Sequence, residues 1–270
     1  MPGGPSQVDT FDPKPRLTAE DGRPSPKLYL GQQRTLLGSP WSFAKHGDSG
    51  LDVSELFPHV AGCVDDLCVI RSMTTDDPNH PGGCLLMHTG ERVASRPSTG
   101  AWVTYGLGSE NQDLPGFIAI GAGPIIEGAR QYGSSFLPAS YQGTFVSDLA
   151  QPLRNLANAQ VSRTEQRREL DGLRRLNELH QRQRSQDLRL AARLQAFELA
   201  YRMQSSAPEA FDLSGETSST AAMYGLDNPQ TANFGKQCLL ARRLAERGVR
   251  FIQLYHTEGG FQPWDQHSNL

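Results

Sequence analysis

The sequence contains little cysteine and no long apolar run. Its 270 residues include four cysteines and no Cys-x-x-Cys pair, so neither a zinc ribbon nor a disulfide scaffold is indicated. No stretch of about 18 consecutive apolar residues occurs, which excludes a membrane-spanning helix within this sequence. The formal net charge is only -3. This near-neutral balance gives no reason to expect nucleic acid as a partner.

Three common catalytic motifs are also missing. The sequence has no Gly-x-Ser-x-Gly, no phosphate-binding P-loop and no Gly-x-Gly-x-x-Gly after a strand. It therefore indicates neither the usual serine hydrolases nor a nucleotide-binding enzyme. Glycine (27 residues) and proline (18 residues) are abundant instead, which is typical of long surface loops around a modest sheet.

The clearest local pattern lies near the end of the sequence. Phe234 to Arg247 form an amphipathic stretch with arginines toward its end, where cations favour the helix dipole. Gly248 is the expected left-handed stop. Val249 to Tyr255 then read as a strand. Repeated helix-glycine-strand units predict an α/β fold, with a mainly parallel sheet flanked by helices.

Similar signals occur earlier in the sequence, and their order supports the same fold class. Residues 123–160 have weaker signals and are expected to form a long packed loop. The elements expected before that loop are a helix over 53–66, a strand over 67–73, a polar loop over 74–83, a helix over 97–109 and a strand over 117–120.

Residues 162–206 differ sharply in composition from the rest. They are rich in arginine, glutamine and glutamate, with leucines at helical spacing. The pattern predicts two helices joined near Arg184-Ser185-Gln186, as a long hairpin inserted into a single α/β domain over 1–270. Acidic residues are interleaved with the arginines, so a solvated, salt-bridged face is favoured over a phosphate-binding one.

Reactive side chains gather in loops, some of which follow expected strands. His80 lies in the polar loop after residues 67–73, His256 follows the last strand, and Asp265 and His267 lie beyond it. Because chemistry in open α/β sheets sits at the carboxyl ends of strands, Asp265-x-His267 is a natural ligand pair. Carboxylates and imidazoles bind divalent metals, which polarise ester oxygens and activate nucleophiles.

A glycine-rich stretch at the start of the sequence also reads as a catalytic loop. It runs from Gly3 and contains Ser6, Asp9 and Thr10, which supply two hydroxyls and a carboxylate. The alternative interpretation is that Asp9, Thr10 and the nearby Asp12 cap turns. A lone Asp-x-His is likewise a weak signal by itself.

Six blocks stand in order along the chain: GGPSQVDTFDPK (3–14), SELFP (54–58), VIRSM (69–73), RPS (96–98), YGLGS (105–109) and WDQH (264–267). Together they closely resemble the family catalogued as domain of unknown function 1501 (DUF1501). That family resembles a branch of the alkaline phosphatase and sulfatase superfamily. The resemblance implies a large α/β fold with a divalent-metal site at the strand ends, in bacterial proteins often exported through a twin-arginine signal.

The resemblance also implies roles for individual residues. Asp9, Asp265 and His267 match positions of metal ligands, and Ser6 or Thr10 matches the nucleophile position, with the choice between them open. His80 and His256 remain further candidates. No Cys-x-Pro-x-Arg motif occurs, so formylglycine chemistry is not indicated.

Two functions are compatible with this resemblance. The first is a metal-dependent hydrolase of phosphate or sulfate esters, acting on a small molecule or a carbohydrate ester. The second is a non-catalytic exported binding protein that uses the same scaffold, because a fold does not transfer activity. Relatives carry a strand before the glycine-rich loop and Gly-Glu-Phe-Gly-Arg-Thr-Pro and Arg-Asp-His blocks after the Asp-x-His loop. We therefore expect a fragment of roughly the first half, inactive by itself.

Overall fold

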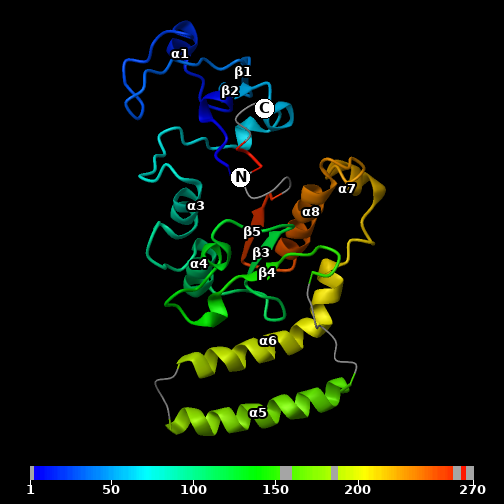
Figure 1. Ribbon diagram of the computed structural model, residues 1–270. Helices are drawn as coiled ribbons and strands as arrows, with labels where there is room; N and C mark the ends of the chain where they lie inside the picture. The colour runs from blue at the N-terminus through cyan, green and yellow to red at the C-terminus, as the bar shows by residue number, and fades with distance from the viewer. Residues whose placement is uncertain (1–2, 153–159, 184–187, 258–262, 266–270) are drawn as a thin grey trace. The chain divides into compact units, whose positions relative to one another are not determined.

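A computed structural model describes residues 3–152, 160–183, 188–257 and 263–265 of the chain (Figure 1). The chain divides into two compact units. One consists of Gly4–Asp76, and the other consists of Asp77–Leu270 together with Met1–Gly3. Each unit has its own buried apolar cluster.

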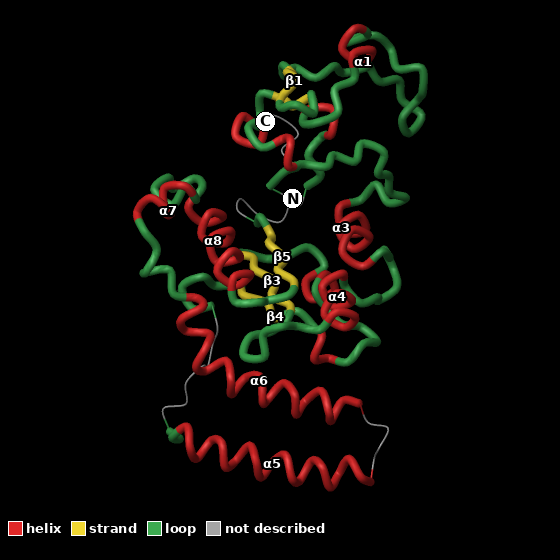
Figure 2. Tube along the Cα trace, turned by 180° about the vertical axis from the view of Figure 1, so that it is seen from behind, coloured by secondary structure: helices red, strands yellow, loops and turns green. Residues whose placement is uncertain are grey.

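The larger unit is built on a parallel three-stranded sheet with the strand order β4-β3-β5 (Figure 2). The central strand β3 (Phe117–Gly121) pairs with β4 (Thr144–Val146) and with β5 (Phe251–Tyr255). All five residues of β3 are buried. Because both faces of a parallel sheet are covered, such a strand is a continuous apolar run rather than an alternating one.

One face of the sheet packs against two helices. Ile118 and Ile120 of β3 share a buried cluster with Leu244 of α8 (Ala232–Glu246) and with the end of α6 (Leu188–Phe211). Figure 2 shows α8 beside the sheet and α6 running away from it. The amphipathic pattern of α8 therefore directs its apolar side chains toward β3.

The other face packs against α4 (Thr99–Leu107). The rings of Phe117 and Phe251 meet edge to face, with centroids 5.2 Å apart. Gly100 of α4 lies directly against them, and a Cβ at this position would approach both rings to 2.6 Å. A glycine is therefore required for α4 to pack this closely on the sheet.

The arginine-rich segment forms α5 (Arg163–Gln183) and α6. Arg167 of α5 donates to both carboxylate oxygens of Glu198 of α6, at 2.8 and 2.7 Å. The same guanidinium lies 5.0 Å from the centroid of the Tyr201 ring. The two helices thus meet through ion pairs, as the interleaved charges predicted. The expected junction at 184–186 lies outside the described residues.

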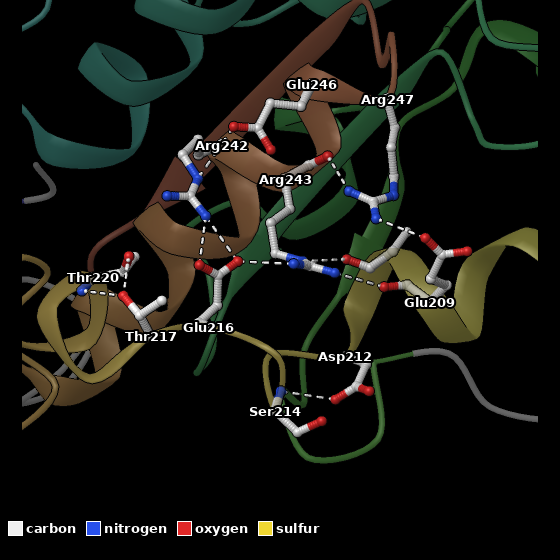
Figure 3. A network of polar contacts seen from close by, with 11 residues as sticks. Glu209, Asp212, Ser214, Glu216, Thr217, Thr220, Arg242, Arg243, Glu246 and Arg247 are labelled. Atoms are coloured by element: carbon white, nitrogen blue, oxygen red, sulfur yellow. Dashed lines mark hydrogen bonds and ion pairs between the residues drawn. The ribbon is translucent and has the colours of Figure 1, made fainter.

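A second ion-pair network holds the segment after α6 against α8 (Figure 3). Arg242 donates to both oxygens of Glu216 at 2.7 Å, and Arg243 donates to the same carboxylate at 2.8 Å. Arg243 also donates to the backbone oxygens of Glu209 and Ala210. Hydrogen bonds from Arg242 and Arg243 hold the pKa of Glu216 below its ordinary value of 4.5. The remaining helices of the described larger unit are α3 (His80–Thr89) and α7 (Ser218–Met223), besides short 3-10 turns.

The smaller unit contains an antiparallel pair, β1 (Phe43–His46) with β2 (Leu51–Ser54). Val53 and Val64 are the most buried side chains of its core. Asp12, 8% exposed, forms an ion pair with Lys14 at 2.7 Å. The short helices are α1 (Pro15–Ala19) and α2 (Pro58–Ala61), with 3-10 turns at Gln7–Asp9 and Val64–Asp66.

The strand expected over residues 67–73 is wrong. These residues form loop and turn. Leu67, Ile70 and Met73 are 43%, 61% and 69% exposed. The apolar run therefore lacks the covering layer that a buried strand needs.

Three further expectations need correction. Val53 belongs to β2 because it pairs with Ala44 of β1, so the helix expected over 53–66 shrinks to α2 and a 3-10 turn. The polar loop ends early, since α3 already begins at His80. The loop expected over 123–160 contains β4, which is too short to show a period of its own.

The remaining expected elements are confirmed. α4, β3, α8 and β5 lie where the pattern predicted them, and Gly248 ends α8 with a left-handed φ of +78°. Among the described helices, none combines the length and apolar character needed to cross a membrane.

Candidate functional site

The carboxyl end of β5 brings several reactive side chains together. β5 ends at Tyr255, and His256 and Thr257 follow directly. The parallel strand β3 ends beside it, with Gly121 paired to Tyr255. This edge of the sheet is where open α/β folds place their ligands.

Asp265 meets a histidine from the other end of the larger unit's sequence. Its Oδ2 lies 3.1 Å from Nε2 of His80. The two side chains are 25% and 35% exposed, so solvent reaches both. His80 is the first residue of α3, so this contact joins the start of α3 to the Asp-x-His loop.

His256 is held by a neighbouring indole. Trp264 Nε1 donates to His256 Nδ1 at 3.1 Å, and Phe234 of α8 places its ring edge-on to the imidazole at 5.1 Å. An indole N–H can only donate, so Nδ1 accepts and the ring proton lies on Nε2. In this arrangement the Nδ1 lone pair of His256 is already used by Trp264.

The glycine-rich stretch touches the same loop through Gly3. Gly3 is buried and has a φ of +114°, a backbone conformation that residues other than glycine rarely adopt. A Cβ on this residue would lie only 2.6 Å from the carbonyl carbon of Trp264 and still closer to the amide nitrogen of Asp265. Only glycine allows the two backbones to approach this closely.

The first turn of α3 has a comparable requirement. Oδ1 of Asp77 accepts a hydrogen bond from the amide of Asn79 at 2.8 Å. The Asp77 carboxylate covers Gly82 so closely that a Cβ there would overlap it. A carboxylate at this end also complements the helix dipole. The Gly82-Gly83 pair suggested a loop, but it lies in α3, and Gly82 lets the Asp77 carboxylate lie against the helix.

Thr257 adds a buried polar atom near the strand end. The residue is 6% exposed, and in the described part of the chain its Oγ1 has no hydrogen-bond partner. The ideal Cβ position of Gly123, beyond the end of β3, lies 3.0 Å from this oxygen. The hydroxyl is therefore available to a further group at this edge.

Burial shifts the pKa values of two titratable groups near the end of β5, His88 and Tyr255. The ring of His88 in α3 stacks on Tyr255 with centroids 5.7 Å apart, and its Nδ1 lies 2.7 Å from the carbonyl oxygen of Cys84. Burial lowers the pKa of His88 and raises the pKa of the Tyr255 phenol. Both groups are therefore kept neutral at ordinary pH.

The other predicted site residues belong to the smaller unit or lie outside the description. Ser6, Asp9 and Thr10 lie on and beside the 3-10 turn Gln7–Asp9. Thr10 donates its hydroxyl to the Gln7 carbonyl at 3.3 Å. His267 lies outside the described residues. Among those described, no group of three or more His, Cys, Asp or Glu side chains forms a metal-ligand cluster.

Sequence reasoning missed three contributors. Trp264 was noted only as part of a motif, while Gly3 and Thr257 received no role. The glycine-rich text did signal a special backbone near Gly3, but the contact with Trp264 and Asp265 depends on folding. No local signal marks Thr257.

The parallel sheet with helices on both faces makes this a mixed α/β protein, and polar groups lie at the carboxyl edge of the sheet. The family described as "Protein of unknown function (DUF1501)" matches residues 1–270. The chain belongs to the DUF1501 family. Neither the curated proteins nor the solved structures gave a match.

Proposed function

We propose that this protein is a metal-dependent hydrolase of phosphate or sulfate esters. Asp9, Asp265 and His267 are the proposed metal ligands, and Ser6 or Thr10 is the proposed nucleophile. The donors are carboxylate oxygen and imidazole nitrogen, which suits divalent ions. A bound ion would supply the Lewis acid that polarises the ester oxygen.

The observation that carries the proposal is the contact of Gly3 with the Trp264–Asp265 peptide. It places the start of the glycine-rich stretch against the Asp-x-His loop at the carboxyl edge of the sheet. Ser6 follows Gly3 by only three residues in the sequence, so it belongs to the same glycine-rich stretch.

The two histidines have different proposed roles. His80 positions Asp265 through their 3.1 Å contact, in the way that outer hydrogen-bond partners orient ligating groups. His256, which Trp264 holds through Nδ1 just beyond the end of β5, is proposed to contact the bound ester.

Hydrogen bonding favours Ser6 over Thr10 as the nucleophile. The Thr10 hydroxyl donates to the Gln7 carbonyl. The Ser6 side chain makes no hydrogen bond with another residue in the ranges that the structure describes, not even as the cap of the turn that follows it. A nucleophile without such a bond is free to turn toward a bound ester.

The parallel sheet also bears on the fold of the family. β4 and β5 are its two outer strands, and parallel sheets are usually wider and covered on both faces. We propose that they belong to a larger alkaline phosphatase-like sheet, and that hydrolysis requires the additional strands. This proposal separates metal binding, expected of the chain itself, from turnover, expected of a longer protein.

Metal content tests the site directly. The purified chain is expected to hold a stoichiometric divalent ion by elemental analysis, and Asp265→Asn and His267→Ala are expected to lose it. His80→Gln is expected to weaken metal affinity by about 10- to 100-fold. Asp227→Asn and His180→Ala are matched controls at exposed positions. A folded, metal-free wild-type protein would contradict the proposal.

Turnover is tested on a longer protein with aryl phosphate and aryl sulfate esters. Ser6→Ala is expected to reduce kcat by more than about a thousandfold, as loss of a nucleophile does. Thr10→Ala is expected to retain most of the activity. The reverse order would identify Thr10 as the nucleophile, and activity in both variants would exclude a serine or threonine nucleophile.

A further inference from the structure

The outer side of α4 carries a row of exposed aromatic rings in the larger unit. Trp102 and Tyr105 are 46% and 50% exposed, and the neighbouring Phe136 is 61% exposed. The Trp102 ring lies 5.8 Å from Phe136 and 6.1 Å from Tyr105, and Tyr105 lies 5.2 Å from Tyr141. All three contacts are edge to face. We call these four residues the aromatic row.

Such a row is unusual on a surface. Large apolar side chains that cluster in contact with water generally mark a binding site. Edge-to-face packing fixes each ring by its neighbours, so little side-chain entropy remains to be lost when a ligand covers the row. Trp102 and Tyr105 lie one helical turn apart on α4, which keeps their separation constant.

The row continues into a groove. Tyr141 lines a groove of about 490 Å³ that lies between α6 and the segments on either side of β3. This volume falls in the range of small-ligand sites. The polar side chains in its wall include Gln112, Ser140, Gln142, Thr144 and Gln195.

The chemistry of this wall is neutral. Its amides and hydroxyls both donate and accept hydrogen bonds. Within the ranges that the structure describes, the side chains of Ser140, Gln142, Thr144 and Gln195 make no hydrogen bond with another residue. The one cation in the wall, Arg202, lies 4.0 Å from the Asp113 carboxylate. The groove therefore offers many neutral hydrogen-bonding groups and little net charge.

We propose that the aromatic row and this groove bind a neutral oligosaccharide. A pyranose ring has an apolar C–H face that covers an aromatic ring, and equatorial hydroxyls that both donate and accept. The aromatic row matches the first property and the amide-lined groove matches the second. Arg202 is the one charged side chain among those that line the groove in the described residues. The site shares no residue with the proposed hydrolase, so either can fail alone.

The test is calorimetric titration of the whole chain with neutral oligosaccharides of about six sugars: β-1,4-glucan, β-1,3-glucan, β-1,4-mannan and β-1,4-xylan. Concentrations up to about 10 mM detect binding as weak as a millimolar Kd. At least one sugar is expected to bind. Trp102→Ala and Gln142→Ala are each expected to weaken that binding at least about tenfold.

Two controls separate recognition from folding. Trp102→Phe keeps an aromatic face and is expected to retain most of the affinity. Tyr29→Ala removes a ring that is 63% exposed, more than Trp102, from the smaller unit and is expected to leave sugar binding unchanged. Thermal melts check that each variant folds.

Three outcomes would overturn the proposal. The first is the absence of binding by every sugar in the panel. The second is equal affinity in wild type and Trp102→Ala. The third is a change in oligomeric mass by light scattering on Trp102→Ala without sugar binding, which would assign the aromatic row to a protein contact.

Discussion

His80 Nε2 and Asp265 Oδ2 lie 3.1 Å apart although 185 positions separate them in the chain. Both side chains are partly exposed, and a polar contact at such a place contributes at most about 1 kcal/mol to stability. The contact therefore matters more for where it holds the Asp265 carboxylate than for the free energy of folding. We therefore expect loss of the His80 contact to change stability little and to weaken metal binding more.

Gly3→Ala is expected to lower the free energy of unfolding by about 1–3 kcal/mol, because the residue has a φ of +114° and no room for a Cβ. It should also displace the Asp265 loop. Gly4→Ala is the matched control, since Gly4 has a φ of +69° but no atom within 4 Å of the added Cβ. Urea unfolding compares the two. Equal losses would show that the Gly3 contact contributes nothing beyond backbone strain.

Gly82→Ala is expected to lower the free energy of unfolding, and Gly83→Ala is expected to raise it. At Gly82 the new methyl group would overlap the Asp77 carboxylate, which should cost about 1–3 kcal/mol. At Gly83 the nearest atom is 4.0 Å away, so alanine should stabilise α3 by about 0.5–1 kcal/mol. Denaturant midpoints distinguish the two variants. A neutral Gly82→Ala would mean that Asp77 does not lie over the helix.

The lowered pKa of Glu216 predicts that the protein loses stability in acid. Its pKa is held below 4.5 by hydrogen bonds from Arg242 and Arg243. The carboxylate thus contributes its full stability above pH 4.5 and loses it as the pH falls through the lower folded pKa. Glu216→Gln should reduce the acid dependence of the unfolding midpoint, while other carboxylates with lowered pKa values, such as Glu198, should retain their share. Glu246→Gln, at a side chain 58% exposed, should keep it.

His88 predicts a separate pH dependence nearer neutrality. Burial lowers its pKa from 6.5. Below pH 6.5 His88 therefore takes up a proton in the unfolded chain but stays neutral in the folded chain until the pH reaches its lower folded pKa. Stability should fall from pH 6.5 down to the folded pKa, by at most about 1.4 kcal/mol per pH unit. His88→Gln should flatten this slope, and His180→Gln, at an exposed site, should not. An unchanged slope in His88→Gln would show that another group causes the pH dependence of stability.

The elements that could be predicted carry their own local signals. α8 has an amphipathic face, Gly248 stops it, and β5 follows as an apolar run. β3 could be predicted from the sequence because a strand that is buried on both faces needs an uninterrupted apolar stretch. β4 could not be predicted in this way, since its three residues become a strand only by pairing with β3.

The wrong predictions share a physical cause. Residues 67–73 have the composition of a strand but no layer to cover them, and Gly82-Gly83 has the composition of a loop but accommodates a carboxylate on a helix. In both cases tertiary contacts decide what local propensity leaves open. The partners of the candidate site residues could not be predicted from the sequence. The contacts of His80 with Asp265 and of Trp264 with His256 exist only after folding.

The topology of the sheet has a consequence for synthesis. β3 ends at Gly121, but its partner β5 begins only at Phe251. At about 5–20 residues per second, a ribosome needs roughly 6–26 s to make the intervening chain. During that interval one edge of β3 has no native partner. Unpaired strand edges invite association with other chains, so we expect the newly made protein to be most prone to association before β5 emerges.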